Sequence, residues 1–478
     1  METVYLQRKL TPYELEPVRD RYKWEEMATL AETVVFELSQ SQQPSIGILY
    51  DPDVDGLMSG FILKHYLERI GYTVKRHMNK GKVHGLKQEA MDWVEREGID
   101  YLFIVDAGSG DSETINQLVS EGKRVIVLDH HDYEPQPLLE GATIINAMNH
   151  AQVKDISGCA VVYYFIEELA QYFEQTVTLY EKYVGISILS DICSMLTREN
   201  RYFVKQAYDA IGTGYLFNYF DFYGSYSSYI AYKLVPHFNA MIRCDLVEEA
   251  MHLSDHFERR TFAKEMKDYL DVKEIQKEKV GQVKELGEGV PLEGLFLKLR
   301  GPQDEDLRPF NGLVANQYMT ELNCSVIVAE YNPDNDCFEG SFRGYDLIKD
   351  DLEGWGIVCQ GHDAACGVSI PSDVLEDLIL NFKHTVNKKQ TVDFIATSVT
   401  YSEDEWTQMA WFNEFYGKDL PKISVELTDK PTNIVYGQRK QELVFEGATV
   451  VEFGAGSKGD RYIVEPTLGT YRTQLIRR

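Results

Sequence analysis

The sequence predicts an α/β protein built around a parallel β-sheet, and three patterns support this class. Apolar runs of strand length recur at four places, which are 46–50, 101–105, 125–128 and 143–145. Stretches of helical pattern separate them, the clearest at 86–97 and 112–120. An acidic residue directly follows each of the first three runs. Alternating strands and helices form parallel sheets with helices on both faces, and strands buried on both faces are apolar throughout.

Helical patterns surround this predicted sheet. Residues 1–43 precede it, and the patterns at 160–185 and 200–285 follow it. Within the last of these, the segment 264–284 is rich in Lys and Glu. We expect that segment to form one long, exposed connecting helix.

Two further regions follow the helical part. Strands are predicted at 294–299 and 325–329, which indicates a second α/β domain. Beyond residue 390, Thr and Val are frequent, and short strands are predicted at 450–453 and 462–464. A small β-rich domain is therefore expected at the C-terminal end.

Composition and charge narrow the functional classes. The chain has 478 residues, a formal net charge of −28 and seven cysteines without C-x-x-C spacing. It begins without a signal-peptide pattern and has no apolar run that could span a bilayer, so we expect a cytoplasmic protein with no membrane partner. The charge argues against a protein that coats nucleic acid over its whole surface. It leaves open whether the basic residues between 75 and 87 line a local channel or form a solvated face.

Three carboxylates crowd into five positions after the first predicted strand. Asp51, Asp53 and Asp55 precede Gly56, where the chain turns into a predicted helix. Like charges this close push one another toward protonation, and a divalent cation removes that conflict because hard cations prefer carboxylate oxygen. A solvated acidic turn is the alternative for this motif taken alone.

Further acidic and imidazole groups follow the other strands. Asp106 follows the second strand, the triplet Asp129-His130-His131 follows the third, and Asp191 ends a later apolar run. Taken singly, Asp106 could cap a helix and His131 could be a turn residue. Loops at the carboxyl ends of parallel strands converge on one crevice, so we expect these groups to meet. An oxygen-rich set with one imidazole suits two divalent cations, Mn²⁺ first and Mg²⁺ second, and two such cations can activate a water for phosphoryl displacement.

These motifs resemble the four metal motifs of the DHH phosphoesterase superfamily, which the triplet at 129–131 names. Within it, the all-aspartate first motif, the segment Glu199-Asn200-Arg201 and the P-x-x-N-A-x-x-R segment at 236–243 resemble RecJ, a single-strand-specific exonuclease. Segments at 340–343 and 361–367 resemble the DHH-associated domain, although Gln360 and Cys366 depart from its pattern.

The resemblance implies a domain order and a set of site residues. The expected domains are a DHH metal-binding domain at 1–200, a helical connector at 201–285, a DHH-associated substrate domain at 286–388 and a β-rich, OB-like domain at 389–478. The implied metal ligands are Asp53, Asp55, Asp106, His130 and Asp191, with Asp106 as the bridge. The triplet Asp129, His130 and His131 is implied to be catalytic, with His131 on the scissile phosphate and Asp129 orienting the histidines. The implied phosphate-binding residues are Asn239, Arg243, Ser341, Arg343 and His362, although an interface salt bridge is the alternative for both arginines and a helix cap for Asn239.

Three functions are weighed on this basis. The first is a Mn²⁺- or Mg²⁺-dependent exonuclease that releases 5′-mononucleotides from single-stranded DNA in the 5′→3′ direction, as the resemblance to RecJ implies, with a role in DNA repair and recombination. The second is a phosphodiesterase for short oligonucleotides or cyclic dinucleotides, which the acidic charge favours and which the all-aspartate first motif and the long connector oppose. The sequence leaves open whether RNA is also cut. The third is a non-enzymatic partner in a replication or repair assembly, which the retention of all five ligand residues opposes.

Overall fold

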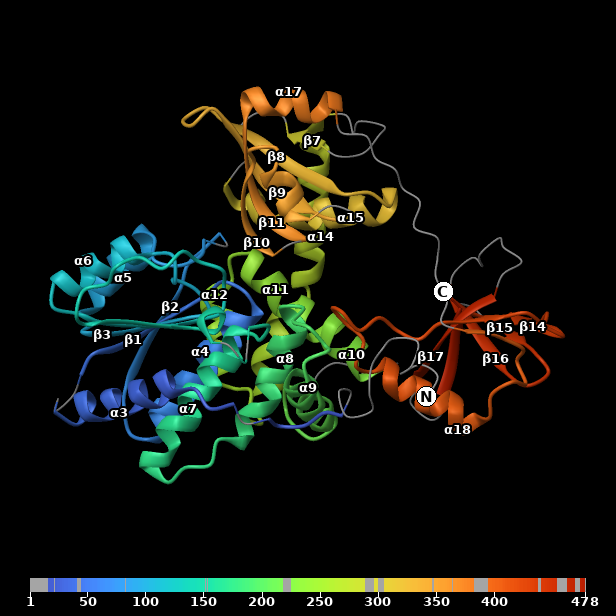
Figure 1. Ribbon diagram of the computed structural model, residues 1–478, viewed down its shortest axis with the longest axis horizontal. Helices are drawn as coiled ribbons and strands as arrows, with labels where there is room; N and C mark the ends of the chain where they lie inside the picture. Colours follow the sequence, from blue (N-terminus) through green and yellow to red (C-terminus); the bar gives the residue numbers. More distant parts are fainter. Residues whose placement is uncertain are drawn as a thin grey trace.

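The computed structural model describes most of the chain. The described residues are 16–20, 22–40, 44–81, 83–150, 152, 154–217, 225–288, 296–299, 305–345, 348–362, 364–381, 394–436, 440–453, 462–468 and 473–477. Three sheets and a central group of helices make up the molecule, and the predicted α/β class is confirmed (Figure 1).

The first sheet is five-stranded and entirely parallel, in the order β2-β1-β3-β4-β5. Its strands are β1 Ile46–Tyr50, β2 Val74–Met78, β3 Tyr101–Val105, β4 Arg124–Asp129 and β5 Ala142–Asn146. The four strands predicted from apolar runs are all present. The edge strand β2 was missed because its sequence, Val-Lys-Arg-His-Met, lacks an apolar run and alternates only partly.

Helices cover both faces of this sheet. They are α3 Glu25–Gln40, α4 Val54–Arg69, α5 Gln88–Glu97, α6 Ser112–Ser120 and α7 Gly158–Phe173. One apolar cluster joins α3, α4 and α7 to one face, and another joins α5 and α6 to the opposite face. The residues of β1 and β3 are buried throughout, as expected for strands covered on both sides.

A group of helices follows the first sheet. It contains α8 Glu181–Ser190, α9 Arg198–Ala210, α10 Tyr226–Tyr229, a π-helical turn Ile230–Leu234, α11 Val235–Arg243, α12 Val247–Ser254, α13 Phe262–Glu265, a 3₁₀ turn Met266–Tyr269 and α14 Val272–Leu286. The prediction of one long helix over 264–284 is wrong, because a regular helix begins only at Val272. Phe262 and Met266 are buried, so the chain bends to bring them into the core before α14 starts. The uniform Lys/Glu composition hid that break.

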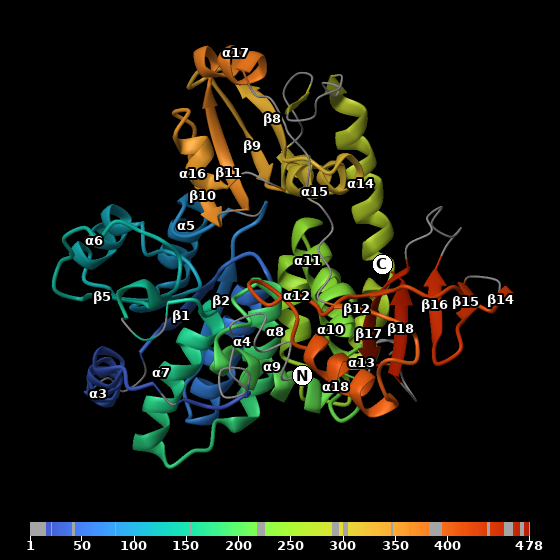
Figure 2. The same cartoon turned by 45° about the vertical axis from the view of Figure 1, so that its right-hand side comes forward.

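The second sheet is six-stranded and mostly antiparallel, in the order β10-β11-β9-β8-β7-β6. Its strands are β6 Gly287–Glu288, β7 Phe296–Leu299, β8 Val326–Asn332, β9 Cys337–Arg343, β10 Val358–His362 and β11 Ala365–Pro371. A 3₁₀ turn Glu305–Phe310 and the helices α15 Asn311–Leu322, α16 Lys349–Glu353 and α17 Ser372–Asn381 accompany it. In Figures 1 and 2 this orange unit stands above the first sheet, with α14 running up to it.

The third sheet is seven-stranded, in the order β12-β13-β17-β18-β16-β15-β14. Its strands are β12 Phe394–Ala396, β13 Val425–Leu427, β14 Asn433–Tyr436, β15 Lys440–Val444, β16 Thr449–Phe453, β17 Tyr462–Leu468 and β18 Thr473–Arg477, and α18 Glu403–Asn413 packs against β17. The C-terminal region is therefore β-rich, as predicted. Its apolar residues join the same core cluster as α7 to α12.

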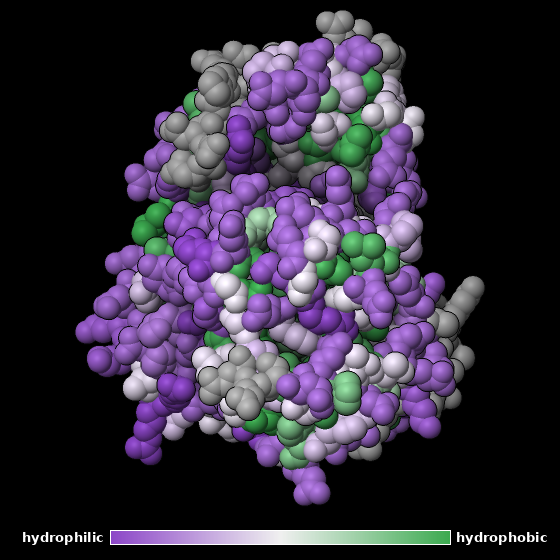
Figure 3. Space-filling view, turned by 90° about the vertical axis from the view of Figure 1, so that its left-hand side faces the viewer, coloured by the Kyte–Doolittle hydropathy of each residue, from purple (hydrophilic) through white to green (hydrophobic). Residues whose placement is uncertain are grey.

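The face of the molecule in Figure 3 is mainly polar. Figure 3 shows one side of the molecule as largely hydrophilic, with apolar residues in small scattered groups. None of the described helices combines the length and the apolar character that crossing a bilayer requires.

Candidate metal centre

The carboxyl ends of β1, β3 and β4 meet at one edge of the first sheet. Asp51 directly follows β1, Asp53 is the N-cap of α4, and Asp55 lies in the first turn of that helix. Asp106 directly follows β3, and Asp129 ends β4. Because the strands are parallel, these residues share one edge, and burial keeps most of them from water.

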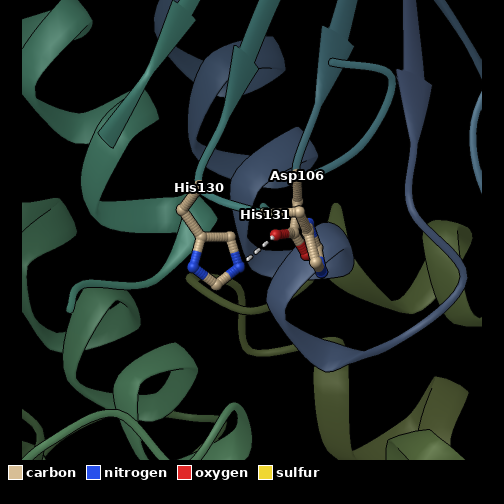
Figure 4. Close-up of side chains that lie close together, drawn as sticks. All are labelled: Asp106, His130 and His131. Atoms are coloured by element: carbon tan, nitrogen blue, oxygen red, sulfur yellow. Dashed lines mark ion pairs between the residues drawn. The ribbon is translucent and has the colours of Figure 1, made fainter. Parts of the chain in front are cut away.

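One imidazole nitrogen gathers three of these carboxylates. His130 Nε2 lies 3.2 Å from Asp106 Oδ1, 3.7 Å from Asp191 Oδ2 and 4.0 Å from Asp55 Oδ2. The first of these pairs is drawn in Figure 4, with His131 beside it. Asp191 is the C-cap residue of α8, which lies outside the first sheet, and its carboxylate also lies at this edge.

The side chains form three overlapping groups whose ligand atoms lie within 4.8 Å of one another. The groups are Asp55 with His130 and Asp191, Asp106 with His130 and His131, and Asp51 with Asp53 and Asp106. Asp106 and His130 each occur in two of the groups, so these two side chains connect the three. Asp51 was not among the predicted ligands, although its place two residues before Asp53 was a visible signal.

The chemistry of this donor set fits divalent cations. Burial, followed by Asp191 and Asp53, raises the pKa of Asp55 to about 8, and burial raises the pKa of Asp106 well above its ordinary value. Asp106 Oδ1 is buried and accepts no hydrogen bond from the described residues, although His130 Nε2 is near. Crowded, buried carboxylates hold their charge only beside a cation, and oxygen ligands suit Mn²⁺ and Mg²⁺.

The first residues of α7 hold the carboxylates of Asp55 and Asp106 in place. Asp55 accepts hydrogen bonds from Gly158 N and Cys159 N, both at 2.8 Å, and from Ser187 Oγ at 2.8 Å. Gly158 also lies against Asp106, since a Cβ on it would be 2.2 Å from Asp106 Oδ1. Asp106 has a φ of +63°, in the left-handed region that non-glycine residues enter at a cost. The backbone is therefore shaped to bring these carboxylates together.

Asp129 does not join the ligand groups and instead organises the histidines. Its Oδ1 accepts from His130 N at 2.7 Å and lies 2.8 Å from His131 Nδ1, and Oδ2 accepts from Ser109 N at 3.2 Å. Although burial opposes ionisation, His131 holds the pKa of Asp129 well below its usual range. Burial likewise opposes the charge on His131, but Asp129 outweighs it and raises the pKa of His131 to about 10.

A second histidine contact was not predicted. His84 Nδ1, on the loop after β2, lies 2.8 Å from Asp51 Oδ2. His84 is separated from the motif by 33 residues, and nothing in its local sequence distinguishes it from a polar loop residue. Only the folded chain shows that it touches the acidic group.

The predicted phosphate-binding residues come from two other parts of the molecule. Arg243 ends α11, whereas Ser341 and Arg343 lie at the end of β9. Asn239 lies one helical turn before Arg243 and inside α11, so it caps no helix. His362 ends β10, and its side chain lies outside the described part of the chain.

The two arginines lie near each other and near the acidic group. Burial, followed by Arg343, lowers the pKa of Arg243 to about 10, and the charge of Asp53 opposes this. Burial also lowers the pKa of Arg343. Among the described residues, no carboxylate lies within ion-pair distance of either guanidinium, so neither arginine forms a salt bridge with a described residue. Half-buried cations that no described carboxylate neutralises are suited to an incoming anion.

Gly312 of α15 completes this second group and was not predicted. A Cβ on Gly312 would lie 2.5 Å from Arg343 Nη2 and 3.5 Å from Ser341 Oγ. The absence of a side chain therefore lets the helix approach the guanidinium closely.

The described basic residues between 75 and 87 each have a carboxylate partner. Lys75 pairs with Glu97 at 3.3 Å, Arg76 with Asp255 at 2.8 Å, Lys80 with Asp245 at 3.8 Å and Lys87 with Asp111 at 3.2 Å, while Lys82 lies outside the described residues. These cations are paired on the surface or at the contact with α12.

Comparison with known proteins identifies the domain that carries the acidic group. Residues 45–190 match the DHH family, N-terminal domain. A putative SPbeta prophage-derived single-strand DNA-specific exonuclease of Bacillus subtilis strain 168 is 25% identical over 458 residues, which cover 85% of this chain and 77% of that protein. The single-stranded-DNA-specific exonuclease RecJ of the same strain is 24% identical over 373 residues, covering 71% of this chain and 45% of RecJ.

The whole chain also matches a solved structure. RecJ in complex with Mn²⁺ from Thermus thermophilus superposes with a TM-score of 0.75 and 17% identity, over 99% of this chain and 74% of that one. The first sheet with its helices is thus similar to the N-terminal domain of the DHH family, and the fold of the chain resembles that of RecJ.

Proposed function

We propose, from the DHH-family domain at residues 45–190, that this chain is a divalent-cation-dependent nuclease that degrades single-stranded DNA from the 5′ end and releases 5′-mononucleotides. One observation carries the proposal. A buried group of carboxylates and one imidazole lies beside two arginines that have no carboxylate partner among the described residues. Such a pairing suits a phosphodiester, which needs cations on its oxygens from both sides.

The proposed cation ligands are the five residues predicted from sequence together with Asp51. They are Asp51, Asp53, Asp55, Asp106, His130 and Asp191, with Asp106 shared. Two bound cations, Mn²⁺ or Mg²⁺, would lower the pKa of a water and offset the charge that develops on the phosphoryl oxygens. The RecJ of Thermus thermophilus has been solved in complex with Mn²⁺ and with Mg²⁺, which supports this choice of metal.

The remaining side chains would bind and orient the substrate. Asp129 holds Nδ1 of His131, so Nε2 is the nitrogen that would reach the scissile phosphate. Arg243 and Arg343 would bind backbone phosphates through their planar forks, with Ser341 donating its hydroxyl. Asn239 and His362 are retained in the proposed phosphate-binding set.

The proposal divides the work between four domains. Residues 1–200 would carry the chemistry, 201–285 would connect, 286–388 would bind the strand, and 389–478 would form the β-rich domain. The two relatives named as single-strand DNA-specific exonucleases support single-stranded DNA as the substrate.

A second candidate is a phosphodiesterase for short oligonucleotides. The net charge of −28 favours it, as does the pairing of the described basic residues between 75 and 87 with carboxylates, which removes one track for a long strand.

End-labelled substrates test the two functions. The full chain is incubated with Mn²⁺ and a long single strand labelled at either end, with Asp106→Asn as the inactive control. Rapid release of labelled mononucleotide from the 5′ label, and late release from the 3′ label, is expected. A dinucleotide is tested in parallel, and cleavage of the dinucleotide alone would support the second candidate. If Mn²⁺ supports cleavage of neither the long strand nor the dinucleotide, both candidate functions are refuted.

A further inference from the structure

A tight turn of the C-terminal region reaches the loop that follows Asp191. Gly417 and Leu420 pair through two backbone hydrogen bonds, Gly417 N to Leu420 O at 3.0 Å and Leu420 N to Gly417 O at 3.2 Å. Leu420 is buried in the core and anchors the turn, which leaves Lys418 at its tip. Gly417 packs so closely on Met195 that a Cβ there would lie 2.6 Å from Met195 Cγ.

Lys418 contacts the loop through both its backbone and its side chain. Met195 N donates to Lys418 O at 3.0 Å, and Lys418 Nζ donates to Asp155 Oδ2 at 3.1 Å. The other oxygen of Asp155 accepts from Ser194 N at 3.0 Å. Two successive backbone amides of the loop, those of Ser194 and Met195, are thus held by Lys418 and its ion-pair partner.

The segment that resembles the RecJ E-N-R motif holds the same loop from the other side. Asn200 Nδ2 donates to Asp155 O at 2.8 Å and to Ser194 O at 2.9 Å, and Arg201 Nη1 donates to Met195 O. Both side chains are buried. The loop at 191–195 is therefore held on one side by residues of α9 and on the other by the C-terminal turn.

The loop needs such support because its conformation is strained. Ile192, next to Asp191, has a φ of +54° and is 65% exposed. A β-branched residue in the left-handed region is unfavourable and persists only when its surroundings fix it. Asp191 itself must stay near His130, at 3.7 Å, and within the group that includes Asp55.

We infer that the turn Gly417–Leu420 is a positioning element of the metal centre, with Lys418 as its central residue. It holds the loop at 191–195 so that the Asp191 carboxylate faces the cation, and this rests on the cation site of the proposed function. Within the described part of the chain, Lys418 makes no contact with the predicted ligands and acts through Asp155 and Met195. Docking of the C-terminal region and cation affinity are thereby coupled.

The substitution Lys418→Glu separates this role from general electrostatics. Replacing a cation by an anion makes the potential near a divalent-cation site more negative, which by itself strengthens Mn²⁺ binding. The positioning role requires the opposite sign, because the new carboxylate repels Asp155 and releases the loop. The direction of the change therefore distinguishes the two effects.

The experiment measures the Mn²⁺ affinity of the full chain by titration calorimetry or by electron paramagnetic resonance of free Mn²⁺. The melting temperature is measured on the same samples. Lys418→Glu is expected to weaken Mn²⁺ binding about tenfold, in the range typical of residues that orient metal ligands. Lys418→Arg is expected to retain wild-type affinity. The matched control is Lys422→Glu, on the same segment, because Lys422 pairs with Glu465 inside the C-terminal region at 3.5 Å. The melting temperature should change little, since exposed ion pairs contribute little stability.

Three results would overturn the inference. They are unchanged or tighter Mn²⁺ binding by Lys418→Glu, equal weakening by Lys418→Glu and Lys422→Glu, and failure of Lys418→Arg to retain affinity. A wild-type chain that binds no Mn²⁺ would refute the cation site and this inference together. One that binds Mn²⁺ but cleaves no phosphodiester would refute only the proposed nuclease, and the affinity comparison would still decide the role of Lys418.

Discussion

The acidic group and the arginine pair lie near each other, yet they are assembled in different ways. Asp51, Asp106 and His130 all follow strands of one parallel sheet, so their separation is fixed by strand spacing and register. Arg243 ends a helix of the central group, whereas Arg343 ends a strand of the second sheet. The placement of Asp51, Asp106 and His130 therefore depends on the backbone of one sheet, whereas the placement of the arginine pair depends on how two parts of the molecule are arranged.

The largest expected effect comes from Asp106→Asn, which tests the acidic side alone. Asn keeps the shape of the side chain and tolerates a left-handed φ, but it removes the shared charge. Loss of this electrostatic stabilisation should lower the rate of DNA cleavage by on the order of 10³-fold. Without metal, the melting temperature should rise, because a crowded buried carboxylate has gone. Retained Mn²⁺-dependent activity would contradict the proposed shared ligand.

A smaller effect is expected from Gly158→Ala, which changes the backbone support of the acidic group. The added methyl would collide with Asp106 Oδ1, so Mn²⁺ affinity should fall roughly 10–100-fold, as for other residues that orient metal ligands. The control is Gly281→Ala in α14, where nothing lies within 4 Å of the new Cβ, and there the helix should gain about 0.5–1 kcal/mol. Equal Mn²⁺ affinity in both variants would show that Gly158 does not position Asp106.

Arg343→Lys tests the other side of the comparison. Lysine keeps the charge but loses the planar fork, so KM for single-stranded DNA should rise about tenfold while kcat changes less. Mn²⁺ affinity should stay the same, since Arg343 belongs to the arginine pair alone. Arg308→Lys, in the same region and paired with Glu330, is the matched control and should leave KM unchanged. A lower Mn²⁺ affinity in Arg343→Lys would contradict the claim that the arginine pair and the acidic group act independently.

A separate effect, on stability and not on activity, concerns pH and the helix that carries Arg243. Burial, followed by Lys273, lowers the pKa of His237 to about 4. The unfolded chain binds the proton near pH 6.5, so the free energy of unfolding should decrease as pH falls from about 6.5 toward 4, by up to roughly 3 kcal/mol. Denaturant titrations of His237→Phe should show a shallower decrease than the wild type. Equal slopes in His237→Phe and the wild type would contradict the prediction.

Much of the fold could be predicted because apolar runs and helical spacing are local properties. The strands at 46–50, 101–105 and 125–128 lie in the middle of a sheet, so burial on both faces required continuous apolar sequence. The edge strand β2 was not predicted, because an edge strand is less completely buried than a central one. Its sequence therefore combines apolar and charged residues and lacks a continuous apolar run. The break before α14 escaped because it depends on the burial of Phe262 and Met266 in a distant core.

The sequence by itself determined the chemistry of the site: which strands end in carboxylates or histidines, and that these lie at one edge. That follows from the alternation of elements, because parallel strands point their carboxyl ends the same way. Only the tertiary structure decided that His84 touches Asp51, that two arginines from separate parts lie together without a carboxylate among the described residues, and that Lys418 supports the loop of Asp191. Those contacts join residues far apart in the chain, and no local pattern encodes the distance between them.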